Sequence, residues 1–189
     1  MQIAMTEPEQ LMLAGLLRCS HRYLEFGSGG STVLASRLVR DSVIAVDSSR
    51  EWLDKVAEAC PAERSASLAL HHVDIGPLGN WGVPTDETTR PRWPNYHHSI
   101  WANPAAERAD LVLVDGRFRV ACFLQALLRC APGTTLLLHD YPERAHYHPV
   151  EEVARPVMAL DTLVAFQRRP EFDPRRANAI LERYWDELG

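Results

Sequence analysis

Residues 23–32 bring an acid, three glycines and several hydroxyl side chains together in the order Tyr-Leu-Glu-Phe-Gly-Ser-Gly-Gly-Ser-Thr. The mostly apolar start predicts a short buried strand, and Ser31 and Thr32 can cap a helix that follows it. The glycines carry no Cβ atom, so a ligand can approach their backbone closely. A strand that leads through glycines to a helix N-terminus is typical of nucleotide-type binding sites in open α/β sheets.

The order of residues in this stretch distinguishes between two nucleotide-type ligands that it could bind. Gly27 and Gly29 match the first two positions of the dinucleotide pattern Gly-x-Gly-x-x-Gly, but Thr32 stands at the third. Glu25 would repel a pyrophosphate and attract a cation that carries an amino-acid tail. The stretch resembles the first motif of class I S-adenosylmethionine-dependent methyltransferases. An NAD-type site and an ordinary strand–turn–helix corner are the alternatives.

Acidic residues mark the carboxyl ends of five predicted strands, at Glu25, Asp47, Asp74, Asp115 and Asp140. In doubly wound sheets ligands bind outside this edge, so these acids predict the place of the site. Asp47 lies 20 residues after Gly27, the spacing of an acid that accepts hydrogen bonds from ribose hydroxyls. That spacing suits S-adenosylmethionine and NAD equally.

The resemblance to methyltransferases extends the predicted cofactor site. In that family an acid after the third strand commonly meets the adenine amino group, and Asp74 has this position. A turn residue before Gly76 and Pro77 is the alternative for Asp74. The predicted cofactor-binding residues are Glu25, Gly27, Ser28, Gly29, Gly30, Thr32, Asp47, Asp74 and Asp115.

Residues 114–119, Val-Asp-Gly-Arg-Phe-Arg, and 138–141, Leu-His-Asp-Tyr, resemble strand ends of small-molecule methyltransferases of the catechol O-methyltransferase-like type. In the metal-dependent members, acids at these two strand ends hold Mg²⁺ or a similar ion. Those members have an acid–Asn pair after the fifth strand, where this chain has Asp140 and Tyr141. A divalent metal is therefore not favoured, and no metal ligand is predicted.

Methyl transfer from a sulfonium is an in-line displacement, so the protein mainly supplies alignment and a closed site. His139 and Asp140 are predicted to be catalytic, as candidates for the base that removes a proton from the acceptor. A strand-end histidine bonded to the backbone is the alternative for His139. Arg117 and Arg119 could hold a carboxylate or phosphate of a small anionic acceptor; solvated helix arginines are the alternative.

These residues can come together only if a sheet positions them, and the hydrophobic pattern of the sequence predicts such a sheet. We expect an α/β fold with a doubly wound, mostly parallel seven-stranded sheet and a C-terminal antiparallel hairpin, similar to class I methyltransferases over about residues 20–170. The expected strands are 23–26, 43–46, 68–73, 110–115, 134–139, 157–160 and 163–167. The expected helices are 6–18, 31–39, 49–60, 118–130 and one that begins at residue 173 and extends to residue 188.

Residues 76–108 interrupt this rhythm with five prolines and three tryptophans. Long loops without regular structure are often lids or binding loops, so we expect a lid-like insertion with a short helix near residues 96–101. Trp93 and His97, within it, are predicted to contact the substrate. A dimer contact or a surface flap is the alternative. The whole chain, residues 1–189, is expected to form a single domain.

The composition of the chain restricts the classes of partner that we expect it to bind. The net charge of −5 argues against a general nucleic-acid binder. The first ten residues lack a basic region, and the apolar run at 11–17 is too short to span a bilayer. We therefore expect a cytoplasmic protein without a membrane partner and with four reduced cysteines. The sequence is compatible with a homo-oligomer and does not decide the oligomeric state.

Together these patterns favour S-adenosylmethionine-dependent methyl transfer to an unidentified small molecule. Two alternatives stand beside this reading. One is a methyltransferase-like binding or regulatory protein without turnover, because a fold alone does not establish a reaction. The other is an NAD-dependent oxidoreductase, which Glu25 and Thr32 disfavour.

Overall fold

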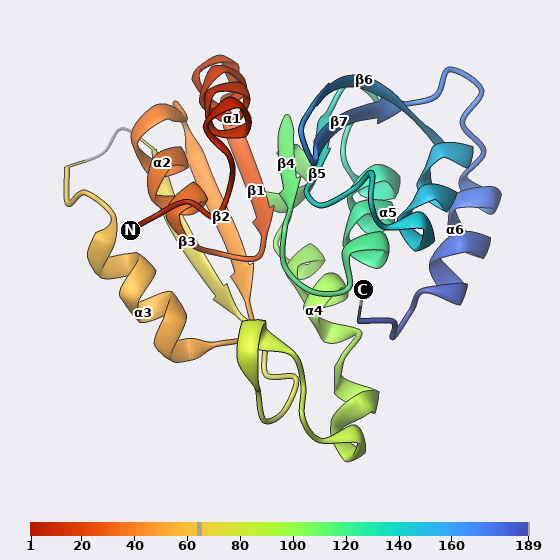
Figure 1. Cartoon of the computed structure of the whole chain (residues 1–189), viewed down its shortest axis with the longest axis horizontal. Coiled ribbons are helices and arrows are strands. Elements are labelled where there is room, and N and C mark those ends of the chain that lie inside the picture. The colour runs from red at the N-terminus through yellow and green to blue at the C-terminus, as the bar shows by residue number, and fades with distance from the viewer. Residues whose placement is uncertain (64–65, 189) are drawn as a thin grey trace.

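A seven-stranded sheet forms the centre of the computed structural model, which describes residues 1–63 and 66–188 (Figure 1). The strand order is β3-β2-β1-β4-β5-β7-β6. The first five strands run parallel, whereas β7 pairs antiparallel with both β5 and β6. The predicted fold class, including the C-terminal antiparallel hairpin, is confirmed.

The strands are β1 (Arg22–Phe26), β2 (Ser42–Asp47), β3 (Ser67–His72), β4 (Leu111–Val114), β5 (Thr135–Leu138), β6 (Ala154–Leu160) and β7 (Leu163–Arg168). The α-helices are α1 (Glu7–Cys19), α2 (Gly30–Leu38), α3 (Arg50–Ala59), α4 (Asn95–His98), α5 (Arg119–Arg129) and α6 (Pro174–Arg183). Within the described ranges, no helix combines the length and the apolar character that crossing a membrane requires.

Helices cover both faces of the sheet because its central strands are apolar on both sides. In β1, Tyr23 packs into a cluster with residues of α1 and α2, whereas the next residue, Leu24, packs into a cluster with α5. The alternation of side chains along a strand produces these two layers. Helices α1 to α3 lie against one face, and α4 to α6 lie against the other (Figure 1).

Residues 76–108 form a chain of short helices rather than an open loop. The expected short helix is present as α4 and a following 3-10 helix, Ser99–Ala102. Trp93, Tyr96 and Trp101 are buried in the same core cluster as α5. Trp81, by contrast, has a positive φ of 60° and is 86% exposed. The predicted role as a lid stays a prediction.

Two element boundaries differ from the expectation by more than one residue. The last helix ends at Arg183, and residues 184–188 form a tail that folds back onto residues 90–118. The tail is held by hydrogen bonds from Phe118 N to the Leu188 carbonyl (3.0 Å) and between His97 Nε2 and the Trp185 carbonyl (2.8 Å). Strand β6 begins at Ala154, three residues early, and has a register irregularity next to Pro156, which lacks the N–H that a regular ladder uses.

Candidate functional site

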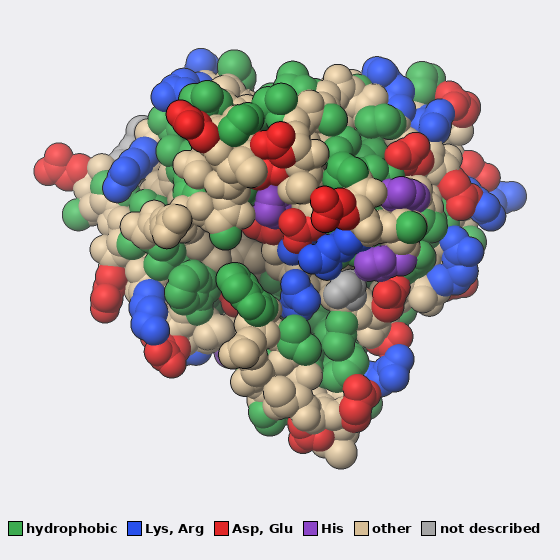
Figure 2. Space-filling model, in the orientation of Figure 1, with side chains coloured by type: hydrophobic (Ala, Val, Ile, Leu, Met, Phe, Trp, Pro, Cys, Tyr) green, Lys and Arg blue, Asp and Glu red, His purple; other side chains and the backbone are tan. Residues whose placement is uncertain are grey.

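The candidate site lies at the carboxyl ends of β1, β2, β4 and β5, where the chain leaves each strand for a helix or loop. Figure 2 shows acidic, basic and histidine side chains gathered near the middle of the face that Figure 1 presents. The glycine segment after β1 provides one side of this edge. The acids after β4 and β5 provide the other.

The glycine segment is fixed by hydroxyl groups at the start of α2. The Gly29 N–H donates to Thr32 Oγ1 (3.0 Å), and the same hydroxyl donates to Glu25 Oε2 (2.7 Å). Ser31 Oγ donates to the other oxygen of Glu25. Thr32 therefore has a structural reason to replace the third glycine of the dinucleotide pattern, because its side chain bonds the loop that it follows.

Glu25 is a buried anchor of this loop. Its side chain is 1% exposed, so a ligand at the surface of the loop would not reach it directly. Burial, together with the charges of Asp115 and Asp47, raises the pKa of Glu25 to about 8 against the hydrogen bonds from Ser31 and Thr32. Glu25 is thus held largely protonated at neutral pH, a state suited to a fixed position in the core.

Gly27 allows two loops to meet. It has a φ of +95°, and a Cβ atom there would lie 2.7 Å from the nitrogen of Gly116, which follows β4. A Cβ atom on Gly116 would lie 2.2 Å from Tyr96 Oη and 2.8 Å from Gly27 N. Only glycine at both positions permits this contact between the loops after β1 and β4.

Asp47, at the end of β2, is oriented by the glycine segment. Its Oδ2 accepts hydrogen bonds from Ser28 N (3.0 Å) and Ser28 Oγ (2.8 Å), and its Oδ1 accepts one from Ser49 N (3.0 Å). Trp52 Nε1 donates to the Ser28 carbonyl at 2.7 Å, which holds a partly exposed indole against the loop. A half-buried carboxylate and an aromatic face therefore border the same backbone.

Two predicted cofactor residues lie in different surroundings. A Cβ atom on Gly30 would meet the Gln2 carbonyl oxygen at 2.4 Å, so the N-terminal segment covers this glycine. Asp74 is exposed; its Oδ1 accepts a hydrogen bond from Gly76 N (2.9 Å), and its Oδ2 pairs with Arg92 (2.7 Å). These contacts are those of a turn residue.

Asp115, His139 and Asp140 come together at the ends of β4 and β5. His139 Nδ1 lies 2.8 Å from Asp115 Oδ1 and 3.6 Å from Asp140 Oδ1. Burial lowers the pKa of His139, but the hydrogen bond and charge of Asp115, with the charges of Asp140 and Glu9, raise it overall. The imidazole is therefore stabilised in its charged form.

Glu9, on α1, completes this cluster and was not among the predicted residues. Its Oε2 lies 3.5 Å from His139 Nε2, and its Oε1 accepts hydrogen bonds from the backbone and hydroxyl of Thr162. Burial raises the pKa of Glu9, but these bonds, the Thr6 N–H and the charge of His139 lower it to about 2. The sequence Thr-x-x-Glu does predict a capping box, which is present. No sequence signal places Glu9 beside β5.

The two predicted substrate arginines have opposite surroundings. The guanidinium of Arg119 is buried and bonded to the loops after β4 and β5. Among the described residues no hydrogen bond or ion pair reaches the half-buried guanidinium of Arg117, and its Nε is a buried atom without a partner. Burial and the neighbouring charges of Arg119 and Arg144 lower the pKa of Arg117, against the effect of Tyr147 and Tyr96.

Trp93 and His97 lie in the core of the 76–108 segment. Trp93 Nε1 donates to Thr89 Oγ1 (3.0 Å), and its ring packs near Phe118. His97 is fully buried between the Trp185 carbonyl and Gln125. Burial, against the bond to Trp185, lowers its pKa to about 4. Neither side chain faces the strand-end acids.

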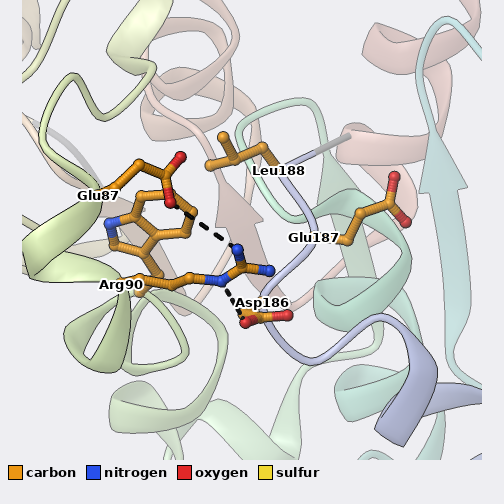
Figure 3. Close-up of a pocket in the computed structure, with 6 residues that line it drawn as sticks. Glu87, Arg90, Asp186, Glu187 and Leu188 are labelled. Carbon is orange, nitrogen blue, oxygen red and sulfur yellow. Dashed lines mark hydrogen bonds and ion pairs between the residues drawn. The ribbon is translucent and has the colours of Figure 1, made fainter.

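A shallow pocket lies between the 76–108 segment and the C-terminal tail. Figure 3 shows Arg90 lying between Glu87 and Asp186, with Glu187 and Leu188 on the opposite side. Arg90 Nε is 2.6 Å from Asp186 Oδ2. Trp93 is the one predicted site residue among those lining it. The pocket is therefore separate from the strand-end cluster.

Comparisons with solved structures place this chain among methyltransferases. A methyltransferase-like protein from Silicibacter pomeroyi is 34% identical, covers 98% of this chain and 97% of its own, and has a TM-score of 0.86. A ribosomal protein L11 methylase from Lactobacillus delbrueckii is 16% identical over 85% of this chain and 79% of its own, with a TM-score of 0.52. That second likeness shows the fold alone.

No protein-family model and no curated protein sequence matches the chain. The full-length likeness to the Silicibacter pomeroyi protein nevertheless combines shared sequence with shared structure. No comparison supports the oxidoreductase alternative. The chain belongs to the class I S-adenosylmethionine-dependent methyltransferase superfamily.

Proposed function

We propose that this protein binds S-adenosylmethionine over the carboxyl ends of β1, β2 and β4 and transfers its methyl group to a small-molecule acceptor. The observation that carries the proposal is the coupling of the glycine loop to Asp47, through both the backbone and the hydroxyl of Ser28. This coupling presents an acid beside glycines whose backbone a ligand can approach. Family membership supports the same cofactor.

In this proposal Gly27, Ser28 and Gly29 line the cofactor, and Asp47 accepts hydrogen bonds from the ribose hydroxyls. The exposed face of Trp52 is available for the adenine ring, which stacks on aromatic side chains. Glu25 and Thr32 act indirectly, by fixing the loop. Asp115, half-buried beside Gly116 at the end of β4, borders the sulfonium end, where its carboxylate is paired with Arg119 and His139. Gly30 and Asp74 are not part of the proposed cradle.

The acceptor in this proposal is a small anion, held by Arg117. A half-buried guanidinium with no partner among residues 1–63 and 66–188 is costly, and a carboxylate or phosphate on the acceptor would satisfy it with paired hydrogen bonds. Arg144 is engaged with Asp140 and Tyr147 instead. Arg117 is therefore the arginine available at this edge.

His139 and Asp140 remain the proposed candidates for proton removal. His139 must first lose its own proton, and its raised pKa moves that step to higher pH. Asp140 accepts hydrogen bonds from Arg119 and Arg144, so its carboxylate is already neutralised. If His139 is the base, turnover should rise as pH increases through its raised pKa. A turnover that does not change across that range would contradict this role of His139.

Calorimetric titration with S-adenosylmethionine, S-adenosylhomocysteine and NAD tests the cofactor assignment. We expect micromolar binding of the first two and no binding of NAD. Binding of NAD, or of none of the three, would contradict the proposal. The comparison needs no knowledge of the acceptor.

One observation favours a second candidate, a methyltransferase-like protein that binds the cofactor without turnover. The acids after β4 and β5 already have partners within the protein, which leaves no free base at this edge. A screen with methyl-labelled cofactor against carboxylate- and phosphate-bearing phenols and amines separates the two. Labelled product supports the enzyme, and tight cofactor binding without product from any acceptor supports the second candidate.

A further inference from the structure

We infer that the guanidinium of Arg119 is the built-in cation of the cluster formed by Asp115, His139 and Asp140, where it takes the place of a divalent metal ion. The three side chains each offer a ligand atom, and these atoms lie within 4.8 Å of one another. Such a group of oxygen and nitrogen donors is large enough to surround a metal ion. The question is what neutralises its two carboxylates.

Arg119 already supplies a positive charge at this place. Its NH2 nitrogen lies 3.2 Å from Asp115 Oδ1, and its NH1 nitrogen lies 3.0 Å from Asp140 Oδ2. The side chain is 5% exposed. A single buried guanidinium therefore bridges the two acids that a metal would have to bridge.

The remaining bonds of Arg119 hold it in this position. Its Nε donates to the Gly116 carbonyl (3.0 Å), NH1 to the His139 carbonyl (2.6 Å) and NH2 to the Asp115 carbonyl (3.1 Å). With the bond from NH1 to Asp140 Oδ2, the guanidinium donates four hydrogen bonds, and its NH2 nitrogen also forms an ion pair with Asp115 Oδ1. Swinging Arg119 aside would leave buried donors and acceptors unpaired, which is unfavourable.

A metal ion would also have to compete with two arginines for the carboxylate of Asp140. Asp140 Oδ2, which accepts from Arg119, also accepts from Arg144 NH2 at 3.0 Å. A divalent ion within about 4 Å of two guanidinium groups would be strongly repelled in a partly buried site. The residues present do not fit a metal, because one oxygen of each carboxylate is already paired with arginine and His139 Nδ1 is already paired with Asp115.

This inference does not depend on the proposed cofactor or acceptor. It assigns Arg119 a positioning role, in which one cation ties the loop after β4 to the loop after β5. It also separates Arg119 from Arg117, two residues away, which is free to meet a ligand. The same geometry predicts that removing the guanidinium exposes a site that can bind a metal.

Binding of Mn²⁺ alone, measured by electron paramagnetic resonance and calorimetry, tests the inference on the full chain. The proteins compared are the wild type, Asp115→Asn, Arg119→Ala, Arg119→Lys, and Arg119→Ala combined with Asp140→Asn. Arg37→Ala, an exposed arginine in the last turn of α2, is the matched control. Circular dichroism establishes that each variant is folded.

We expect no specific Mn²⁺ binding by the wild type, Arg37→Ala or Arg119→Lys. Arg119→Ala should bind one Mn²⁺ at least about tenfold more tightly than the wild type, and adding Asp140→Asn should remove that binding. A wild type that binds one Mn²⁺, with the binding lost in Asp115→Asn, would overturn the inference. A folded Arg119→Ala that binds no Mn²⁺ would also overturn it. If Arg119→Ala does not fold, the wild-type and Arg119→Lys measurements still decide.

Discussion

Arg117 and Arg119 are identical side chains two positions apart, yet their surroundings give them different roles. All three guanidinium nitrogens of Arg119 donate hydrogen bonds inside the protein, whereas the buried Nε of Arg117 has no partner in the part of the chain that the structure describes. The turn at Phe118, with a positive φ of 54°, separates the two. From the sequence we predicted that both arginines contact the substrate. Residue type and spacing cannot show which guanidinium already has hydrogen-bond acceptors inside the protein.

Replacing Arg117 by Gln should remove anion binding and leave the cofactor site intact. We expect inorganic phosphate to raise the melting temperature of the wild type at constant ionic strength, because it satisfies the guanidinium. Arg117→Gln should lose most of this increase, and Arg37→Gln should retain it. Equal stabilisation of all three proteins would show that phosphate acts elsewhere.

Glu25 should make the protein less stable as pH rises. Its pKa is about 8 in the fold against an ordinary value of 4.5, so between these values the folded protein keeps a proton that the unfolded chain has lost. The free energy of unfolding should therefore fall by up to about 1.4 kcal/mol per pH unit in this range. Denaturant unfolding from pH 5 to 8 should show a smaller slope for Glu25→Gln.

The exposed Glu58 of α3 provides the control for that series. Glu58→Gln should keep the wild-type slope. If Glu25→Gln and the wild type lose stability in parallel, the raised pKa of Glu25 is not the source of the pH dependence.

The position of α1 is set by contacts between its first turn and two other parts of the fold. Glu9 joins the first turn of this helix to the turn between β6 and β7 through Thr162, and to the end of β5 through His139. Thr6 adds a bond to Asp161 in the same turn (2.5 Å). The N-terminus of α1 thus clamps the antiparallel hairpin against the parallel part of the sheet.

Acid should weaken this clamp. The pKa of Glu9 is depressed to about 2 in the fold from an ordinary 4.5, so its contribution is present above pH 4.5 and is lost as pH falls toward 2. Glu9→Gln should be about 1–3 kcal/mol less stable than the wild type at pH 7, and the difference should shrink at pH 3. Urea unfolding at both pH values measures it. A difference that does not change with pH would contradict the ionised role of Glu9.

The contact between the loops after β1 and β4 can be tested with two glycines. Gly116→Ala should destabilise the protein by about 1–3 kcal/mol and weaken cofactor binding, because its Cβ would collide with Tyr96 and Gly27. Gly15→Ala, in an exposed helical position with nothing within 4 Å of the added atom, should stabilise by up to about 1 kcal/mol. Thermal unfolding measures the stability of both variants against the wild type. A Gly116→Ala variant with unchanged stability and cofactor binding would show that the two loops can separate.

The sequence predicts this architecture well where local patterns decide it. Apolar runs at 43–46 and 111–114, with glycines after β1, were enough to predict the sheet and its binding edge. Contacts distant in the sequence were not accessible: Glu9 meets Thr162 across 153 positions, and residues 184–188 leave the last helix to bond with His97 and Phe118. Tertiary contacts override local helical preference at such ends.

At the scale of the whole molecule, the parallel sheet places residues from Gly27 to Asp140 on one edge. The two sides of this edge differ in kind: glycines and Asp47 over β1 and β2, and a neutralised carboxylate cluster over β4 and β5. In the proposed function, the first side holds the nucleoside, and the methyl group is transferred at the second. The central claim is therefore that the cofactor depends on Asp47.

Calorimetric titration of S-adenosylhomocysteine into the wild type, Asp47→Ala and Asp74→Ala tests that claim most directly. We expect Asp47→Ala to weaken binding at least about tenfold, because bonds to a charged carboxylate contribute about 1.5–3 kcal/mol. Asp74→Ala, which removes a turn residue at the neighbouring strand end, should stay within about twofold of the wild type. Unchanged affinity in a folded Asp47→Ala protein would contradict the account.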